Sequence, residues 1–445
     1  MGGGFFRSFD PGAGIVLTRG GVIINSGTID GGGGVRTGIV LSGGRVENGS
    51  RADETATISG ILTSPSPTAP VYVRNFGMIR VGITLDDNFN NTVVNFGTIT
   101  AHGTAIAFGG GNDHLIVGPG AVFNGIVDGG AGRNEIEFRQ AGTISLAPEF
   151  IGFSIVRLGD GGANSLALTG ADFMGLPPGT ALTVYGGNND NTIDASVLTV
   201  ADRVILVGGA GPDVFEFSAT GLTNADLVRG RAGTDELLMT SSGRIEAGGI
   251  SGVELYVLAG GGANTLALTD TNFAGVRGRT ITIDDGNSGN RIDAAMLAAD
   301  VHIVVHAGSG RDVLLGGAGN DIFYAGGKTT MTGGRGANEF IFSAPGRNNV
   351  IDFHAFSGDE LVFSNSGFDL GLKGAGEHPR RLPAYLFVAN ETGTFTTKRQ
   401  RFAYDTTTGQ LFYDAHGSAT PAARELVVTL DGDPHLGAAN LFFIT

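Results

Sequence analysis

The sequence predicts an all-β protein: a right-handed parallel β-solenoid that continues into β-roll coils and ends in a β-rich C-terminal cap. Three observations lead to this prediction. Glycine supplies 78 of the 445 residues, while hydrophobic residues remain at 41%; disordered chains lack that apolar content. Short apolar runs alternate with Gly, Asn and Asp, which is typical of short strands joined by tight turns. Internal repeats recur along most of the chain, as they do in solenoids.

The first region, residues 1–140, carries repeats of about 20 residues. An Asn-x-Gly-x-Ile segment occurs at 25–29, 75–79 and 95–99, and between these copies we expect short strands. Asn and Gly tolerate the left-handed backbone that solenoid corners require. The Ser-Pro-Ser-Pro stretch at 64–67 is predicted to loop out from one coil. The expected strands lie at 38–41, 82–85 and 104–108.

Two longer repeats follow, at 141–254 and 255–345. Residues 162–169 (GANSLALT) match residues 262–269 (GANTLALT), at an offset of 100. Both copies end in the same glycine-rich element, so we predict a duplicated structural unit with a specialised end.

That element is a nonapeptide, GGxGxDxUx, in which U is a large apolar residue. Residues 208–216 and 316–324 match it fully, while 230–238 and 307–315 each lack one glycine, and 109–115 is a diverged copy. The glycines are expected to turn a corner, and the last three residues to form a short strand with U in the core. Two nonapeptides would make one coil of about 18 residues, with successive corners stacked about 4.8 Å apart.

Stacked corners would place carbonyl and carboxylate oxygens between coils, which suits the six to eight oxygen ligands of Ca²⁺. Where the sixth residue is Asn, the corner is expected to be a neutral turn, and Lys328 interrupts one further corner. The alternative throughout is a glycine corner that stacks without metal. The predicted calcium-site residues are Gly208, Gly209, Gly211, Asp213, Asp235, Gly308, Gly310, Asp312, Gly316, Gly317, Gly319 and Asp321; the Asn corners are Asn134, Asn164, Asn264 and Asn338.

These nonapeptides resemble the RTX (hemolysin-type) calcium-binding repeats. The resemblance implies a secreted bacterial protein that is exported by a type I ABC machinery and folds on binding Ca²⁺ outside the cell. Residues 346–445 are consistent with it. They contain an Ile-Asp-Phe segment at 351–353 and a predicted aromatic hairpin at 402–417, and they end in the apolar residues 441–445. This region resembles the uncleaved C-terminal targeting region of type I substrates; it can equally be a β cap, and both interpretations can hold.

Composition excludes several classes of partner and site. A net charge of −15 repels nucleic acid and anionic lipid. The absence of cysteine excludes disulfides, a thiol nucleophile and Cys-ligated zinc. Apolar runs are too short for a membrane span. Residues 1–10 show no apolar core of a signal peptide, so we expect secretion without a cleaved N-terminal signal.

The expected function is therefore non-enzymatic: an extracellular calcium-binding repeat protein with a structural, adhesion or matrix role, and a cell-surface or polysaccharide ligand as a candidate partner. No catalytic residue is predicted, because His302 and His306 lack the Glu of HExxH and there is no GxSxG segment. One alternative is a carbohydrate-active β-helix enzyme, a polysaccharide lyase or epimerase, with Asp86 and Asp87 in a cleft. Another is a fragment of a larger RTX toxin or adhesin.

Overall fold

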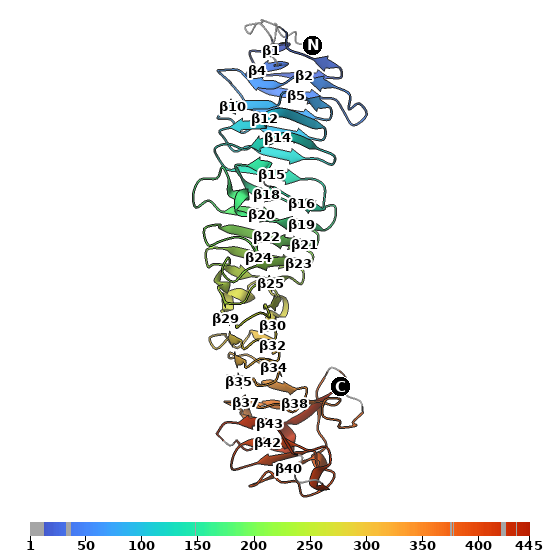
Figure 1. Ribbon diagram of the computed structural model, residues 1–445, viewed down its shortest axis with the longest axis vertical. Helices are drawn as coiled ribbons and strands as arrows, with labels where there is room; N and C mark the ends of the chain where they lie inside the picture. Colours follow the sequence, from blue (N-terminus) through green and yellow to red (C-terminus); the bar gives the residue numbers. More distant parts are fainter. Residues whose placement is uncertain are drawn as a thin grey trace. The chain divides into compact units, whose positions relative to one another are not determined.

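The computed structural model describes residues 13–32, 37–146, 148–373, 376, 378–419, 424–432 and 434–445. Parallel strands stack coil upon coil (Figure 1), so the prediction of an all-β parallel solenoid is confirmed. No helix in these ranges is long and apolar enough to cross a membrane. The chain divides into two compact units, Met1–Val214 and Phe215–Thr445, and the division point lies within β23 (Asp213–Phe217).

In the first unit, three sheets run along the solenoid. Neighbouring strands are one coil apart in the sequence, and they pair in parallel. The first sheet contains β1 (Ile15–Leu17), β4 (Ile39–Leu41), β7 (Ile61–Thr63), β10 (Ile83–Asp87), β12 (Thr98–Gly109), β9 (Met78–Ile79), β6 (Thr57–Ile58), β3 (Thr28–Ile29), β14 (Val122–Asp128) and β17 (Phe150–Ile151). The second contains β2 (Gly21–Asn25), β5 (Gly44–Asn48), β8 (Val71–Asn75), β11 (Thr92–Asn95), β13 (His114–Val117), β15 (Asn134–Phe138), β18 (Phe153–Arg157), β20 (Leu182–Tyr185) and β22 (Val204–Ala210). The third contains β16 (Thr143–Ile144), β19 (Asn164–Ala167) and β21 (Asn191–Asp194).

In the second unit, two long sheets face each other across the core, beside a short pair formed by β24 (Leu227–Ala232) and β27 (Ile250–Ser251). The first long sheet contains β25 (Glu236–Met239), β28 (Leu255–Val257), β30 (Thr280–Asp284), β32 (His302–His306), β34 (Ile322–Ala325), β36 (Glu339–Phe342), β38 (Glu360–Ser364), β44 (Leu441–Ile444) and β39 (Arg380–Arg381). The second contains β26 (Arg244–Ile245), β29 (Thr265–Ala267), β31 (Arg291–Asp293), β33 (Val313–Leu315), β35 (Thr330–Thr332), β37 (Asn348–Val350), β43 (Glu425–Leu430), β42 (Gln410–Tyr413), β41 (Phe402–Asp405) and β40 (Phe387–Asn390).

The helices are short 3-10 turns at the edges of the coils. Two of them occupy matching places in the long repeats, since η1 and η3 follow the GANxLALT segments at the same offset of 100 residues. The predicted duplication therefore extends to local structure. The turns are η1 (Gly170–Phe173), η2 (Ala247–Gly249), η3 (Asp270–Phe273), η4 (Arg277–Arg279), η5 (Ala355–Ser357), η6 (Ala384–Leu386), η7 (Gly417–Ala419) and η8 (Ala438–Asn440).

The repeated Asn of the N-terminal region forms a ladder inside the first unit. The Nδ2 atom of each Asn donates to the Oδ1 atom of the next, at 2.8 Å in each of three steps. Buried amides must find partners, and stacking identical residues satisfies them coil after coil. The ladder residues are Asn25, Asn48, Asn75 and Asn95. Asn48 is a member that the repeat pattern did not identify.

The tandem nonapeptides form the predicted β-roll coil in the second unit. The last three residues of the first nonapeptide form β33, and those of the second begin β34; these strands lie in opposite sheets. Val313 pairs with Thr330 and Ile322 with Glu339, so one coil here is 17 residues long. The U residues Leu314 and Phe323 are fully buried, as expected.

The C-terminal region is a β-rich cap, as predicted. Strands β41 and β42 form the expected antiparallel aromatic hairpin, with Gly409 in the left-handed region (φ 65°). The last apolar strand, β44, pairs in parallel with β38. The apolar C-terminal residues are thus part of a sheet of the second unit.

Candidate cation-binding corners

The four Asp residues predicted as sixth-position ligands all lie at the start of a strand and point inward. Asp213, Asp235, Asp312 and Asp321 are each at most 1% exposed. In three of them a carboxylate oxygen accepts a hydrogen bond from a main-chain N–H of the preceding coil: Asn191 to Asp213 (2.9 Å), Asn290 to Asp312 (2.9 Å) and Ile303 to Asp321 (2.9 Å). The N–H of Asp235 donates to Glu254 Oε2 at 3.0 Å.

Asn residues at the sixth position play the same structural part. Asn338 Oδ1 accepts from the N–H of Asp321 at 3.0 Å, and Asn134 Oδ1 accepts from the N–H of Asp113 at 2.9 Å. Asp321 and Asn338 therefore stack on one edge of the roll, as predicted from their spacing. An amide oxygen is sufficient for this hydrogen bond, so the corner itself does not require a charge.

The predicted glycines lie in the corners, where neighbouring coils approach closely. Gly209 has a φ of 123°, and a Cβ added there would lie 1.7 Å from the carbonyl oxygen of Gly187. A Cβ added at Gly319 would lie 1.9 Å from the carbonyl oxygen of Val301. Close stacking thus accounts for the repeated glycines with or without metal. The other predicted glycines occupy equivalent corners: Gly208, Gly211, Gly308, Gly310, Gly316 and Gly317.

Asp321 lies in the fully matched nonapeptide, yet main-chain N–H groups engage both of its carboxylate oxygens. Oδ1 accepts from Ile303 at 2.9 Å and Oδ2 accepts from Gly317 at 2.8 Å. Burial raises the pKa of Asp321 above its ordinary value, while these two hydrogen bonds lower it. Its carboxylate is therefore satisfied within the corner.

Asp312, on the opposite edge, lies near enough to a second buried carboxylate, Asp285, for its negative charge to raise the pKa of that group. Oδ1 of Asp285 accepts from Gly308 N at 2.7 Å, whereas Oδ2 of each Asp accepts no hydrogen bond from any described residue. Burial, with a contribution from the negative charge of Asp312, raises the pKa of Asp285 to about 7. Burial also raises the pKa of Asp312.

The same arrangement occurs in the first unit with Asp87 and Asp113. Both are buried, and the Oδ2 atom of each lacks a hydrogen-bond partner in the described part of the chain. Burial raises the pKa of Asp113 to about 7, with an added contribution from Asp87. In strand register Asp87 pairs with Gly109, which is the first position of the diverged nonapeptide.

Sequence reasoning missed Asp285 and Asp87 as partners of the sixth-position Asp. The sequence does contain a pattern that could have identified them. Each of these Asp residues begins a corner that lies one coil before a Gly-x-Gly-x-Asp segment. Asp285 precedes the corner GNSGN, and Asp87 precedes NFNN. Neither segment matches the nonapeptide closely enough to be recognised by pattern alone.

The corner that follows Asp312 on the same edge carries no carboxylate. Thr329 takes the sixth position; its Oγ1 accepts from Gly326 N at 3.1 Å, and its own N–H donates to Asn348 Oδ1 at 3.0 Å. Lys328 is exposed beside it. This coil is therefore a neutral corner flanked by a cation.

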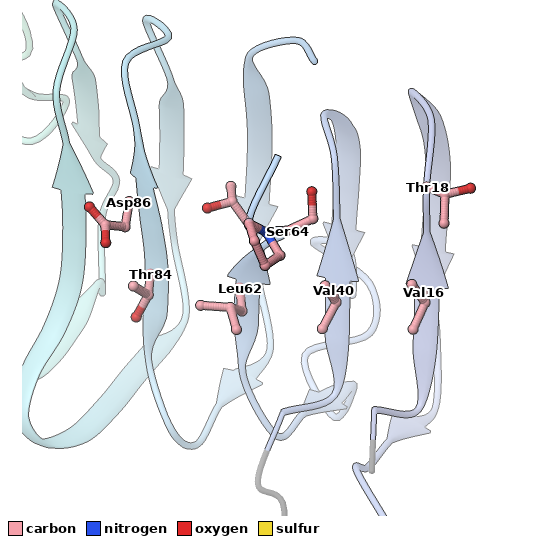
Figure 2. A pocket seen from close by; sticks show the side chains of 9 residues that line it. Val16, Thr18, Val40, Leu62, Ser64, Thr84 and Asp86 are labelled. Atoms are coloured by element: carbon pink, nitrogen blue, oxygen red, sulfur yellow. The ribbon is translucent and has the colours of Figure 1, made fainter. Parts of the chain in front are cut away.

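A separate groove lies on the outer face of the first sheet (Figure 2), with a volume of about 590 Å³. Val16, Val40, Leu62 and Thr84 form a row across adjacent strands, in matching register. Among the described residues that line the groove, Asp86 is the one carboxylate; Ser64 and Pro65 come from the predicted Ser-Pro insertion.

Asp86 and Asp87 do not share this groove. They are consecutive in strand β10, so their side chains point to opposite faces of the sheet. Asp86 is exposed, while Asp87 is buried at 8% exposure. The pair therefore does not form two facing carboxylates in one cleft.

His302 and His306 lie on strand β32, not on a helix. His302 Nδ1 accepts from the N–H of Asn320 at 3.0 Å, and His306 stacks on Tyr324 with ring centroids 4.3 Å apart. The two rings serve separate local contacts.

No family model, curated protein or solved structure matches the chain.

Proposed function

We propose that the protein is an extracellular calcium-binding repeat protein of the RTX-like kind, with a structural, adhesion or matrix role. The observation that carries this proposal is the pair of buried carboxylates at one corner, Asp285 and Asp312, each with one oxygen left without a hydrogen bond. A buried, unpartnered charge is costly, and two such charges side by side repel each other. A bound cation would offset both costs.

Calcium is the cation that the donor atoms favour. Both side chains offer hard oxygen ligands, and the surrounding corners are lined by main-chain carbonyl groups, as at Gly286 and Ser288. Ca²⁺ accepts such mixed carboxylate and carbonyl sets with flexible geometry, whereas Mg²⁺ demands a nearly ideal octahedron. Asp87 and Asp113 would form an equivalent site in the first unit.

Among the other predicted ligands the support is uneven. Asp321 already uses both carboxylate oxygens for main-chain hydrogen bonds, so calcium there would have to displace one of them. Asp213 and Asp235 are buried at equivalent corners and remain candidate ligands. We therefore expect the Asp285–Asp312 site to bind most tightly in the second unit.

Type I export and folding outside the cell complete the proposal, on the strength of the nonapeptides and the C-terminal pattern. A polysaccharide or cell-surface ligand is the proposed partner, and the groove beside Asp86 offers hydroxyl groups above an apolar floor. The lyase or epimerase alternative has less support, because Asp86 and Asp87 lie on opposite faces of their sheet.

The test is calcium titration of the full chain by calorimetry, with Asp285→Asn and Asp312→Asn. Each variant should weaken one class of calcium site at least tenfold, since it removes a charged ligand. In the absence of calcium at pH 8, each should raise the melting temperature, because an isosteric amide removes the charge repulsion while its oxygen still accepts the main-chain hydrogen bond. A loss of binding caused by misfolding would lower the melting temperature instead.

Asp284→Asn is the matched control, since Asp284 precedes Asp285 and is exposed. It should bind calcium and melt like the parent chain. Unchanged calcium binding in both Asp285→Asn and Asp312→Asn would contradict the proposed site.

A further inference from the structure

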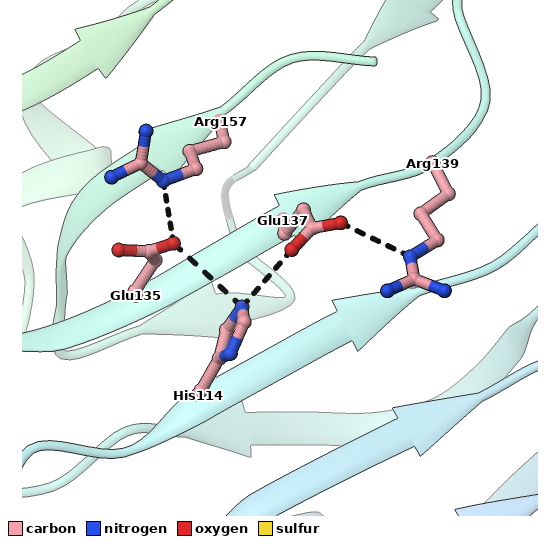
Figure 3. A network of polar contacts seen from close by, with 5 residues as sticks. All are labelled: His114, Glu135, Glu137, Arg139 and Arg157. Atoms are coloured by element: carbon pink, nitrogen blue, oxygen red, sulfur yellow. Dashed lines mark hydrogen bonds and ion pairs between the residues drawn. The ribbon is translucent and has the colours of Figure 1, made fainter. Parts of the chain in front are cut away.

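Three side chains that could ligate a metal meet on the outer face of the second sheet in the first unit (Figure 3). His114 is the first residue of β13, and Glu135 and Glu137 lie on the neighbouring strand β15. His114 pairs in register with Glu135. Because side chains alternate along a strand, Glu135 and Glu137 point to the same side. One ligand atom from each of the three lies within 4.8 Å of the others.

The distances around His114 fit a metal better than a hydrogen bond. Its Nε2 atom lies 3.3 Å from Glu137 Oε2 and 3.7 Å from Glu135 Oε1, and it makes no hydrogen bond with any described residue although it is shielded from solvent. Hydrogen bonds to carboxylates are shorter, at about 2.7–2.9 Å. In a tetrahedral zinc site with bonds of about 2.0–2.2 Å, neighbouring ligand atoms are separated by about 3.3–3.5 Å.

Two arginines hold the carboxylates in place. Arg157 Nε donates to Glu135 Oε1 at 2.6 Å, and Arg139 Nε donates to Glu137 Oε1 at 3.0 Å. Arg157 is itself packed over the ring of Tyr185, 4.4 Å from its centroid. Such outer partners orient ligand side chains in metal sites.

The charges of this group favour one class of ion. Two glutamates and two arginines cancel, so little net negative charge attracts a hard cation such as Ca²⁺. An ion that binds there must therefore gain binding free energy from its bond to the imidazole nitrogen. Zn²⁺ and related transition metals form such bonds readily. The side chains of His114, Glu135 and Glu137 are 33%, 23% and 28% exposed, so the group lies at the surface, where a water molecule can serve as the fourth ligand of an ion.

We propose that His114, Glu135 and Glu137 form a binding site for a divalent transition-metal ion of the Zn²⁺ class, separate from the calcium corners. His114 supplies Nε2 and each glutamate supplies one oxygen. The adjacent Asp113 points to the opposite side of the strand, into the core, so the two sites do not share ligands.

The test is Zn²⁺ titration of the full chain, freed of metal by chelation and then held in saturating Ca²⁺. His114→Ala should lower zinc affinity at least tenfold and abolish the rise in melting temperature that Zn²⁺ gives the parent. Glu137→Gln, which keeps the side-chain shape, should weaken binding in the same direction. Both variants should melt like the parent in chelator, because exposed ion pairs contribute little to stability.

His102→Ala is the matched control, since His102 is exposed on β12 of the same unit, and it should bind Zn²⁺ like the parent. Co²⁺ should give the strong visible absorption of a four-coordinate ion in the parent and in Asp285→Asn, but not in His114→Ala. Persistence of the cobalt signal in Asp285→Asn separates this proposal from the calcium one. If His114→Ala binds zinc as tightly as the parent, the three residues are a surface ion-pair network and the proposal is overturned.

Discussion

Arg231 holds the second position of the nonapeptide at 230–238, where the consensus residue is glycine. Its φ is 80°, in the left-handed region, and it is one of three described non-glycine residues there. A non-glycine residue whose backbone adopts this left-handed conformation lowers the stability of the folded state by about 1–2 kcal/mol. The corner keeps its shape despite this strain, because the surrounding coils determine the backbone. Arg231→Gly should therefore stabilise the protein by about 1 kcal/mol, measured by chemical denaturation.

The gain in Arg231→Gly is reduced by the larger entropy that glycine has in the unfolded chain. Arg229→Gly serves as the control, because Arg229 lies in the same strand, is exposed, and has no positive φ. It should destabilise the protein. If Arg231→Gly were equally destabilising, the strain at this corner would be refuted.

The Asn ladder is the interaction that ties successive elements of the first unit together. Asn75 accepts from Asn48 Nδ2 and donates to Asn95 Oδ1, both at 2.8 Å. Asn75→Ala removes these two hydrogen bonds and the two that Asn75 Nδ2 makes to the carbonyl oxygens of Gly77 (3.1 Å) and Thr98 (3.3 Å), and each lost hydrogen bond costs about 0.5–1.5 kcal/mol. We expect a fall of at least 2 kcal/mol in unfolding free energy, or a corresponding drop in melting temperature.

Asn124→Ala, at an exposed position of β14, should leave stability nearly unchanged and thus controls for loss of an amide as such. Equal melting temperatures of Asn75→Ala and the parent chain would show that the ladder contributes nothing net.

The whole molecule should respond to pH in a direction set by its buried carboxylates. Burial raises the pKa of Asp113 and Asp285 to about 7, above the value of about 3.9 for Asp in an unfolded chain. Between these values the folded state binds more protons than the unfolded state, so stability falls as pH rises from about 4 to 7. In EDTA, the melting temperature should be lower at pH 8 than at pH 5.5.

Calcium should reverse this loss, because it takes the place of the protons. An ion that binds only the folded state stabilises it by about 2.7 kcal/mol at 100 times its Kd. Millimolar Ca²⁺ should therefore raise the melting temperature more at pH 8 than at pH 5.5. A melting temperature in EDTA that rises with pH over this range would contradict the assignment of these groups.

The fold class and the positions of the corners follow from the repeats in the sequence. The Asn-x-Gly-x-Ile repeats, the duplication and the nonapeptides all have periods that a solenoid must have, and local turn chemistry places Gly, Asn and Asp where the backbone bends. The nonapeptide pattern likewise identified Phe323 as a core residue, and aromatic segments around a Thr-Thr-Gly turn identified the hairpin that begins at Phe402.

Which carboxylates lie near one another depends on how the coils stack. Asp285 and Asp312 are 27 residues apart, as His114 and Glu137 are 23 residues apart, and each pair meets because it lies on adjacent coils. Asp321 lies in one of the two fully matched nonapeptides, yet main-chain N–H groups from two coils satisfy its carboxylate. The physical reason is that the period of a solenoid fixes the corner locally, whereas the partners of a side chain come from the coils above and below, whose lengths vary.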